Sequence, residues 1–190
     1  MELPSNRDHL RRLDDSFYMG LAAVHWTLTI LDRRKGWLSD VFYCQFRELL
    51  THSLFRYSIA CPVFCLMPDH IHLMWLCVLE SSNQKLAMRH LRTHCNDALK
   101  CLGFELQDQS YDHVLREDER QESSFIAICE YIARNPERAG LIAIDKYADY
   151  PYTGCLVPGC PELMPFTADY WTRLGRVISW LRRNGFTSES

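Results

Sequence analysis

Apolar and polar positions along the chain change period several times, and each change predicts a new element. Runs rich in β-branched and aromatic residues predict strands at residues 24–31, 57–66, 71–79 and 111–116. Apolar residues near helical spacing predict helices at about 40–55, 84–101 and 117–135, and after Thr167. This order is compatible with an antiparallel sheet covered on one side by helices.

The predicted helix over 84–101 has two distinct faces. Its basic face carries residues at i, i+4 and i+7 spacing, namely Lys85, Arg89, Arg92, Asn96 and Lys100. Apolar residues such as Leu91 and Ala98 lie on a different face, toward the predicted core. Before other motifs are considered, a rail for a DNA backbone and an ordinary solvated helix face explain the basic residues equally well.

Length and composition indicate one globular domain. We expect residues 1–190 to form this domain, with an irregular leader at 1–20 and a C-terminal loop and helix at 153–190. No apolar run is long enough to span a bilayer, and the first residues lack a signal-peptide apolar segment, so we expect a cytoplasmic protein. The formal net charge of −3 argues against a generic nucleic-acid binder, although phosphate binding needs only local Lys and Arg.

The chain has nine cysteines, an odd number, and no Cys-x-x-Cys pair. The nearest pairs are Cys61 with Cys65 and Cys155 with Cys160. Several cysteines fall in apolar, strand-like runs, where a free thiol behaves as a small hydrophobe. Core cysteines in a reducing compartment are therefore favoured over disulfides or a zinc site.

The segment Met67-Pro68-Asp69-His70-Ile71-His72 predicts a strand that begins near a proline. Side chains alternate between the faces of a strand, so His70 and His72 point the same way. Two such imidazoles can bind one divalent metal ion, but a His-x-His pair alone is more often two half-exposed strand histidines.

Three motifs together resemble the HUH single-tyrosine transposases, and most closely the REP-associated tyrosine transposases. They occur in the family's order: the Met-Pro-Asp-His-x-His segment at 67–72, Tyr-Asp-His-Val-Leu-Arg at 111–116, and Tyr-Ile-x-x-Asn-Pro-x-Arg-Ala-Gly-Leu at 131–141. The resemblance runs from about Trp26 to Tyr152. It implies a ferredoxin-like α+β fold, with the histidine pair on a central strand.

The resemblance also implies the chemistry. Tyr131 would attack a single-strand DNA phosphodiester and form a 5′-phosphotyrosine link. His70, His72 and Asn135 would bind Mg²⁺ or Mn²⁺, since N/O ligands without thiolate suit these ions. The spacing of Tyr131 and Asn135 places both on one side of their helix, which should end or kink before Pro136.

The implied partner is single-stranded or hairpin DNA, bound by a monomer or a homodimer without a membrane. We expect the basic face of the predicted 84–101 helix to border the approach to the site. His113 could contact DNA or be a satisfied strand histidine, and Arg138 could meet phosphate or complement a helix C-terminus. The chain lacks the tryptophan that relatives commonly carry just before the Tyr111 segment.

Two other functions remain open from the sequence. A hairpin-binding module would keep recognition without cleavage. A metal-dependent hydrolase or structural metalloprotein would use His70, His72 and nearby cysteines, although the cysteine spacing disfavours it.

Overall fold

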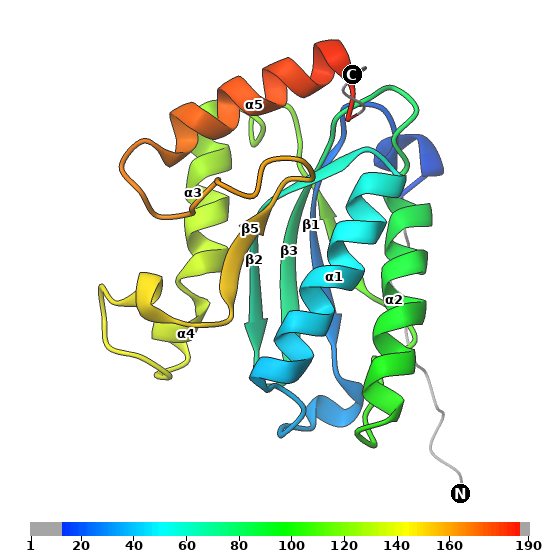
Figure 1. The fold of residues 1–190 in the computed structure, drawn as a ribbon, viewed down its shortest axis with the longest axis vertical. Helices are drawn as coiled ribbons and strands as arrows, with labels where there is room; N and C mark the ends of the chain where they lie inside the picture. The colour runs from blue at the N-terminus through cyan, green and yellow to red at the C-terminus, as the bar shows by residue number, and fades with distance from the viewer. Residues whose placement is uncertain (1–12, 187–190) are drawn as a thin grey trace, which may run out of the picture.

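The computed structural model describes residues 13–186, and in this part of the chain five strands form one antiparallel sheet. The order across the sheet is β4-β1-β3-β2-β5 (Figure 1). The strands are β1 (Ala23–Thr29), β2 (Ile59–Met67), β3 (His70–Cys77), β4 (Tyr111–Val114) and β5 (Thr153–Leu156).

The helices are α1 (Asp40–Arg56), α2 (Gln84–Lys100), α3 (Glu122–Ala133), the single turn α4 (Asn135–Arg138) and α5 (Tyr170–Asn184). Short 3₁₀ turns lie at Asp15–Tyr18, Leu31–Arg33 and Tyr147–Asp149. Side-chain caps fix two helix starts. The Ser39 hydroxyl accepts from the Phe42 amide at 3.2 Å, and Asn83 Oδ1 accepts from the Leu86 amide at 3.0 Å.

The elements from β1 to β4 follow the order β1-α1-β2-β3-α2-β4, and their strands lie in the order β4-β1-β3-β2. This is the ferredoxin-like arrangement that the sequence predicted, and the α+β class is confirmed. His70 and His72 belong to β3, which is the middle strand of the five. The predicted site histidines therefore sit at the centre of the sheet.

Helices pack on both faces of the sheet, so the expectation that they cover only one side was wrong. One face packs against α1 and α2, which run side by side in Figure 1, and its core includes the fully buried Trp26 of β1 and Trp75 of β3. The opposite face packs against α3 and α5, and its core includes Cys129, Ile132 and Leu174. Successive side chains of a strand point to opposite faces of the sheet, so alternate residues of each strand contribute to the two cores.

Several sequence predictions of local structure were wrong. Within the C-terminal region at 153–190, the part before the helix was expected to be loop, but β5 occupies its beginning and pairs with β2. Helix α3 begins at Glu122 instead of 117. The last helix was expected directly after Thr167, but α5 begins at Tyr170 with Asp169 at the N-cap position. In the predicted leader, residues 1–12 lie outside the described residues, while Tyr18 is fully buried in the core.

All nine cysteines lie within the described residues, and none of them forms a disulfide. Six are buried: Cys61, Cys65, Cys77, Cys95, Cys129 and Cys155. This confirms the prediction of core thiols. Over residues 13–186, no helix combines the length and the apolar character that crossing a membrane would need.

Candidate metal and tyrosine site

His70 and His72 point to the same side of β3, as predicted, and their side chains meet. The two Nε2 atoms lie 2.9 Å apart, and His72 is only 9% exposed. Two neutral imidazoles whose Nε2 lone pairs face each other need a proton or a cation between them. The pair therefore forms a focused donor site on the α3 side of the sheet.

A carboxylate orients the first of these rings. His70 Nδ1 lies 2.7 Å from Asp69 Oδ1, and Asp69 also forms an ion pair with Arg33 at 3.0 Å. Burial alone would raise the pKa of Asp69, but the hydrogen bond and charge of His70, together with Arg33, lower it. An ionised Asp69 accepts the Nδ1 proton of His70 and leaves Nε2 as the ligand atom.

Strand β1 supplies the partners of the second ring. His72 Nδ1 lies 3.0 Å from Nε2 of His25 and 3.2 Å from the Thr27 hydroxyl. Burial, followed by the charges of His25 and His70, lowers the pKa of His72 to about 2. Burial, followed by the charge of His113, lowers the pKa of His25 to about 4. Both rings are therefore neutral near pH 7, as a metal ligand and its support must be.

The spacing of the Nε2 atoms fits one divalent cation. Two adjacent ligands of an octahedral ion at about 2.1 Å are separated by about 3.0 Å, and tetrahedral ligands at the same distance by about 3.4 Å. The 2.9 Å separation of the two atoms matches the octahedral value. The donor chemistry and the spacing thus fit Mg²⁺ or Mn²⁺ at His70 and His72.

Tyr131 lies in the last turns of α3, which packs on this same face of the sheet. The tyrosine is 47% exposed, and the guanidinium carbon of Arg138 lies 4.1 Å from its ring centroid. The charge of Arg138 is also among the causes that lower the pKa of His72. Arg138 therefore contacts the tyrosine ring and acts electrostatically on His72.

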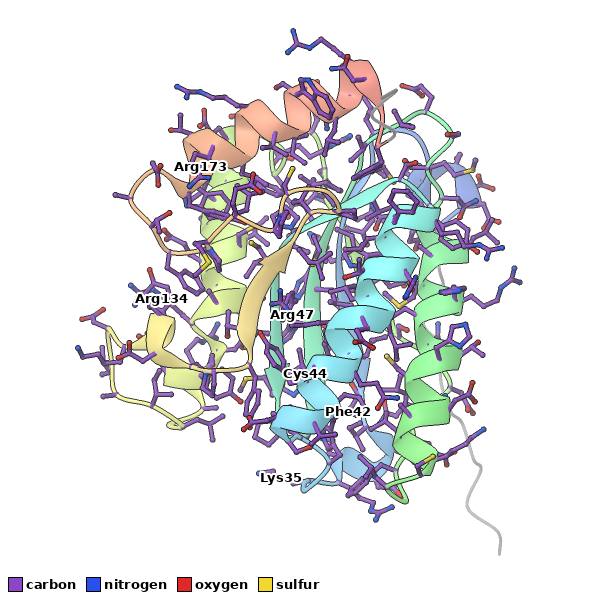
Figure 2. All side chains as sticks on the ribbon, viewed as in Figure 1. Lys35, Phe42, Cys44, Arg47, Arg134 and Arg173 are labelled. Atoms are coloured by element: carbon purple, nitrogen blue, oxygen red, sulfur yellow. The ribbon has the colours of Figure 1, made fainter. Side chains whose placement is uncertain are left out.

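The helix breaks where the sequence predicted, next to Tyr131. Helix α3 ends at Ala133, and Asn135 begins the single turn α4. The side-chain amide nitrogen of Asn135 donates to the carbonyls of Tyr131 at 3.0 Å and Ile132 at 3.1 Å. Because these two acceptors fix the amide orientation, the oxygen is the atom of Asn135 that remains for a cation. Arg134, labelled in Figure 2, joins the two helices and bonds to Glu137 at 3.1 Å.

His113 lies on β4, directly opposite His25 of β1 in the strand register. Its Nε2 lies 2.8 Å from Glu119 Oε1, so a protein partner satisfies it. His113 therefore borders the histidines on the same sheet face. Whether it also contacts DNA stays a prediction.

The basic face of α2 lies elsewhere. Helix α2 covers the sheet face opposite the histidines, so Lys85, Arg89, Arg92 and Lys100 do not lie beside the histidine pair. The expectation that they border the approach to this site was wrong in its geometry. Lys85 forms an ion pair with Asp15, and Arg92 bonds to Ser110 at 3.1 Å, whereas Arg89 and Lys100 are exposed. Their contact with DNA stays a prediction.

His25, Thr27 and Asp69 surround the histidine pair, and His25 and Thr27 lie outside the three sequence motifs. The signal was present in β1, where His25 and Thr27 alternate with the apolar Val24 and Trp26. Two polar residues on one face of an otherwise apolar strand indicate a face with a polar neighbour. Their actual partner followed only from the register that pairs Thr27 with His72.

A cysteine-containing metal site finds no support. Cys65 of β2 is opposite His72 in the register, but burial raises the pKa of its thiol to about 12, and the Thr153 hydroxyl donates to it at 3.3 Å. Across residues 13–186, no three or more His, Cys, Asp or Glu side chains gather as a ligand set. His25 does not add a third nitrogen to the His70–His72 pair, because its Nε2 faces Nδ1 of His72 instead of the point between the two Nε2 atoms.

Comparison with known proteins extends this picture. No protein-family model matches the chain. A curated protein from Haemophilus influenzae, described as a putative REP-associated tyrosine transposase, is 26% identical over 141 residues, covering 67% of this chain and 76% of the relative. A solved structure of a REP-associated tyrosine transposase bound to a REP hairpin superimposes with a TM-score of 0.62 and 17% identity, covering 77% of this chain and 81% of that one. The curated relative is similar to this chain and agrees with the sequence motifs, and the solved structure shares its fold.

Proposed function

We propose that the protein cleaves and rejoins single-stranded DNA beside REP-like hairpins, with Tyr131 as nucleophile. The observation that carries this proposal is the position of an exposed tyrosine, with Arg138 over its ring, on the sheet face where two histidine Nε2 atoms converge. The solved relative is bound to a REP hairpin, which supports the choice of DNA.

In the proposed reaction, the Tyr131 oxygen attacks the phosphorus and the bond from phosphorus to the 3′ oxygen breaks. The phenol proton passes to solvent, and the departing 3′ oxygen takes up a proton. The ester bond is conserved in the 5′-phosphotyrosine, so a 3′-hydroxyl on another strand can reverse the step. A divalent ion, when bound, polarises the scissile phosphate.

Several residues of the chain would have separate roles in the proposed reaction. His70 and His72 would hold the cation, and the Asn135 oxygen would complete the protein ligands. Arg138 would meet a phosphate oxygen beside the tyrosine, because a guanidinium carries several donors in one plane. An ordinary phenol is mostly protonated near neutral pH, so cationic groups around the phosphate are needed to lower the barrier.

The test is an adduct assay. The protein is incubated with Mn²⁺ and labelled single-stranded hairpins from the neighbourhood of its own gene, and covalent complexes are separated on a denaturing gel. We expect Tyr131→Phe to bind hairpins as before and to form no adduct, because only a hydroxyl is removed from an exposed ring. Tyr57→Phe, at the C-terminus of α1, is the matched control and should still form the adduct.

His70→Ala should reduce adduct formation by removing a ligand, and excess Mn²⁺ should restore part of it, which no metal concentration can do for Tyr131→Phe. An adduct with Tyr131→Phe would assign the chemistry to another residue. If the unmodified protein binds a hairpin tightly but forms no adduct, the binding module replaces the enzyme as the function.

A further inference from the structure

We propose that His25 is a positioning residue for the metal site. His25 accepts the Nδ1 proton of His72 and so keeps Nε2 of His72 open for the cation. This inference rests on the metal site of the proposed function and adds a residue that the transposase motifs do not contain. It commits His25 to one role: it holds His72 and does not bind the metal itself.

The contact between the two histidines is direct and sheltered. Nε2 of His25 lies 3.0 Å from Nδ1 of His72, with ring centroids 5.1 Å apart and planes inclined by 41°. His72 is almost completely buried, so water cannot easily take the place of His25. Strand pairing fixes both backbones, because β1 and β3 are neighbours in continuous register from Ala23 to Thr29.

The direction of the proton follows from the chemistry of a neutral imidazole, which carries a single N–H. A cation on Nε2 of His72 leaves Nδ1 as the only place for that proton. Nε2 of His25 must then accept it, and His25 carries its own proton on Nδ1. The Thr27 hydroxyl can donate or accept at 3.2 Å, so it tolerates either arrangement and does not decide between them.

The two predicted ligands are therefore supported differently. An ionised carboxylate, Asp69, accepts the outer proton of His70 at 2.7 Å, whereas a neutral imidazole accepts that of His72. An outer partner of this kind fixes both the tautomer and the ring orientation of a ligand. Without His25, the ring of His72 could hold its proton on Nε2, where it would face the cation and oppose binding.

The experiment compares three variants with the unmodified protein. His25→Leu keeps the volume and removes the acceptor, while the side-chain oxygen of His25→Gln replaces Nε2. His90→Leu is the matched control, because His90 is a partly buried histidine on α2 that bonds to Ser53 at 2.9 Å on the other sheet face. The readouts are Mn²⁺ affinity by calorimetry and histidine tautomers by ¹⁵N NMR of the protein loaded with diamagnetic Mg²⁺.

We expect His25→Leu to weaken Mn²⁺ binding by roughly 10–100-fold, the usual effect of removing the hydrogen-bond partner of a ligand. His25→Gln should recover most of the affinity, and His90→Leu should leave it unchanged. In the unmodified protein loaded with Mg²⁺, His72 should carry its proton on Nδ1 and His25 should not carry one on Nε2. This NMR result also tests the proposal if His25→Leu does not fold.

The outcomes separate the inference from the proposed function. If the unmodified protein binds Mn²⁺ and His25→Leu binds it equally well, His25 has no positioning role although the metal site stands. A proton on Nε2 of His25 in the Mg²⁺-loaded protein would overturn the proposed direction. If the unmodified protein binds no Mn²⁺, the metal site of the proposed function fails, and this inference fails with it.

Discussion

Replacing Gly154 by alanine should destabilise the protein, although the position is in a short edge strand. A Cβ built at Gly154 would lie 2.8 Å from Cζ and 3.3 Å from Cε1 of Phe64. The Phe64 ring is fully buried and packs edge-on against Phe46, with centroids 5.7 Å apart. Arg47, which Figure 2 labels between α1 and β5, closes the outer side, with Nη1 3.5 Å from the same Cβ.

The magnitude follows from this crowding. Carbon atoms in van der Waals contact are about 3.5–4.0 Å apart, so β5 or the Phe64 ring must move by roughly 0.7 Å or more. Overpacking of this kind costs about 1–3 kcal/mol, while the reduced freedom of the unfolded chain returns about 0.4–1 kcal/mol. We expect a net destabilisation of about 1 kcal/mol, which lowers the melting temperature by about 2–4 °C in a chain of this size.

The assay is urea unfolding followed by circular dichroism, with two comparisons. Gly175→Ala makes the same change within α5, where a Cβ meets nothing within 4 Å, and should stabilise the protein by about 0.5–1 kcal/mol. In a Phe64→Leu background the ring is gone, so Gly154→Ala should no longer be destabilising. A stabilising Gly154→Ala in the unmodified background, or an unchanged cost beside Leu at position 64, would refute the tight contact.

Three further predictions address other parts of the molecule. In the native protein, iodoacetamide should modify the exposed Cys44 and Cys101 before the buried Cys95, as read by peptide mass spectrometry, since burial raises the pKa of Cys95 to about 12. The free energy of unfolding of the metal-free protein should fall as pH falls from about 6.5 toward 4, because His25 takes up a proton in the unfolded chain but not in the folded protein. The slope of this free energy against pH is at most about 1.4 kcal/mol per pH unit for His25. His25→Gln should flatten the slope, as followed by urea unfolding at each pH. Replacing the exposed Arg89 and Lys100 by alanine should weaken the salt dependence of hairpin binding. The slope of the logarithm of the binding constant against the logarithm of salt concentration should fall by roughly one unit for each phosphate that is no longer bound. Adduct formation on a short unpaired strand should not change, and an unchanged slope would identify a solvated helix face.

The main elements of the fold could be predicted because their patterns are strong and local. Strands β2 and β3 are long apolar runs, and the polar start of α2 at Asn83 is a well-defined cap. Strand β5 could not be predicted in the same way. It has only four residues, one of them Gly154, and it lies between Pro151 and Pro158. Its strand conformation is stabilised by pairing with the edge of β2.

The site was predictable to the extent that its residues are close in sequence. His70 and His72 share a face by simple alternation, and the helix break before Asn135 follows from Pro136. The contribution of His25 depends on which residues β1 and β3 bring opposite each other, and a single sequence does not contain that register. The position of the α2 basic face relative to the histidines could not be predicted for a similar reason. Helical spacing shows which residues share a face of the helix, but not on which side of the sheet the helix packs.

The separation of the two sheet faces has an evolutionary consequence. The tryptophan-rich core under α1 and α2 is built from one set of alternating strand residues, and His25, Thr27, His70 and His72 come from the other set. Substitutions of these four residues, which would disable the proposed chemistry, therefore leave the core under α1 and α2 untouched. If the proposed strand cleavage is lost or altered by such mutations, the fold can still remain under separate selection as a stable scaffold.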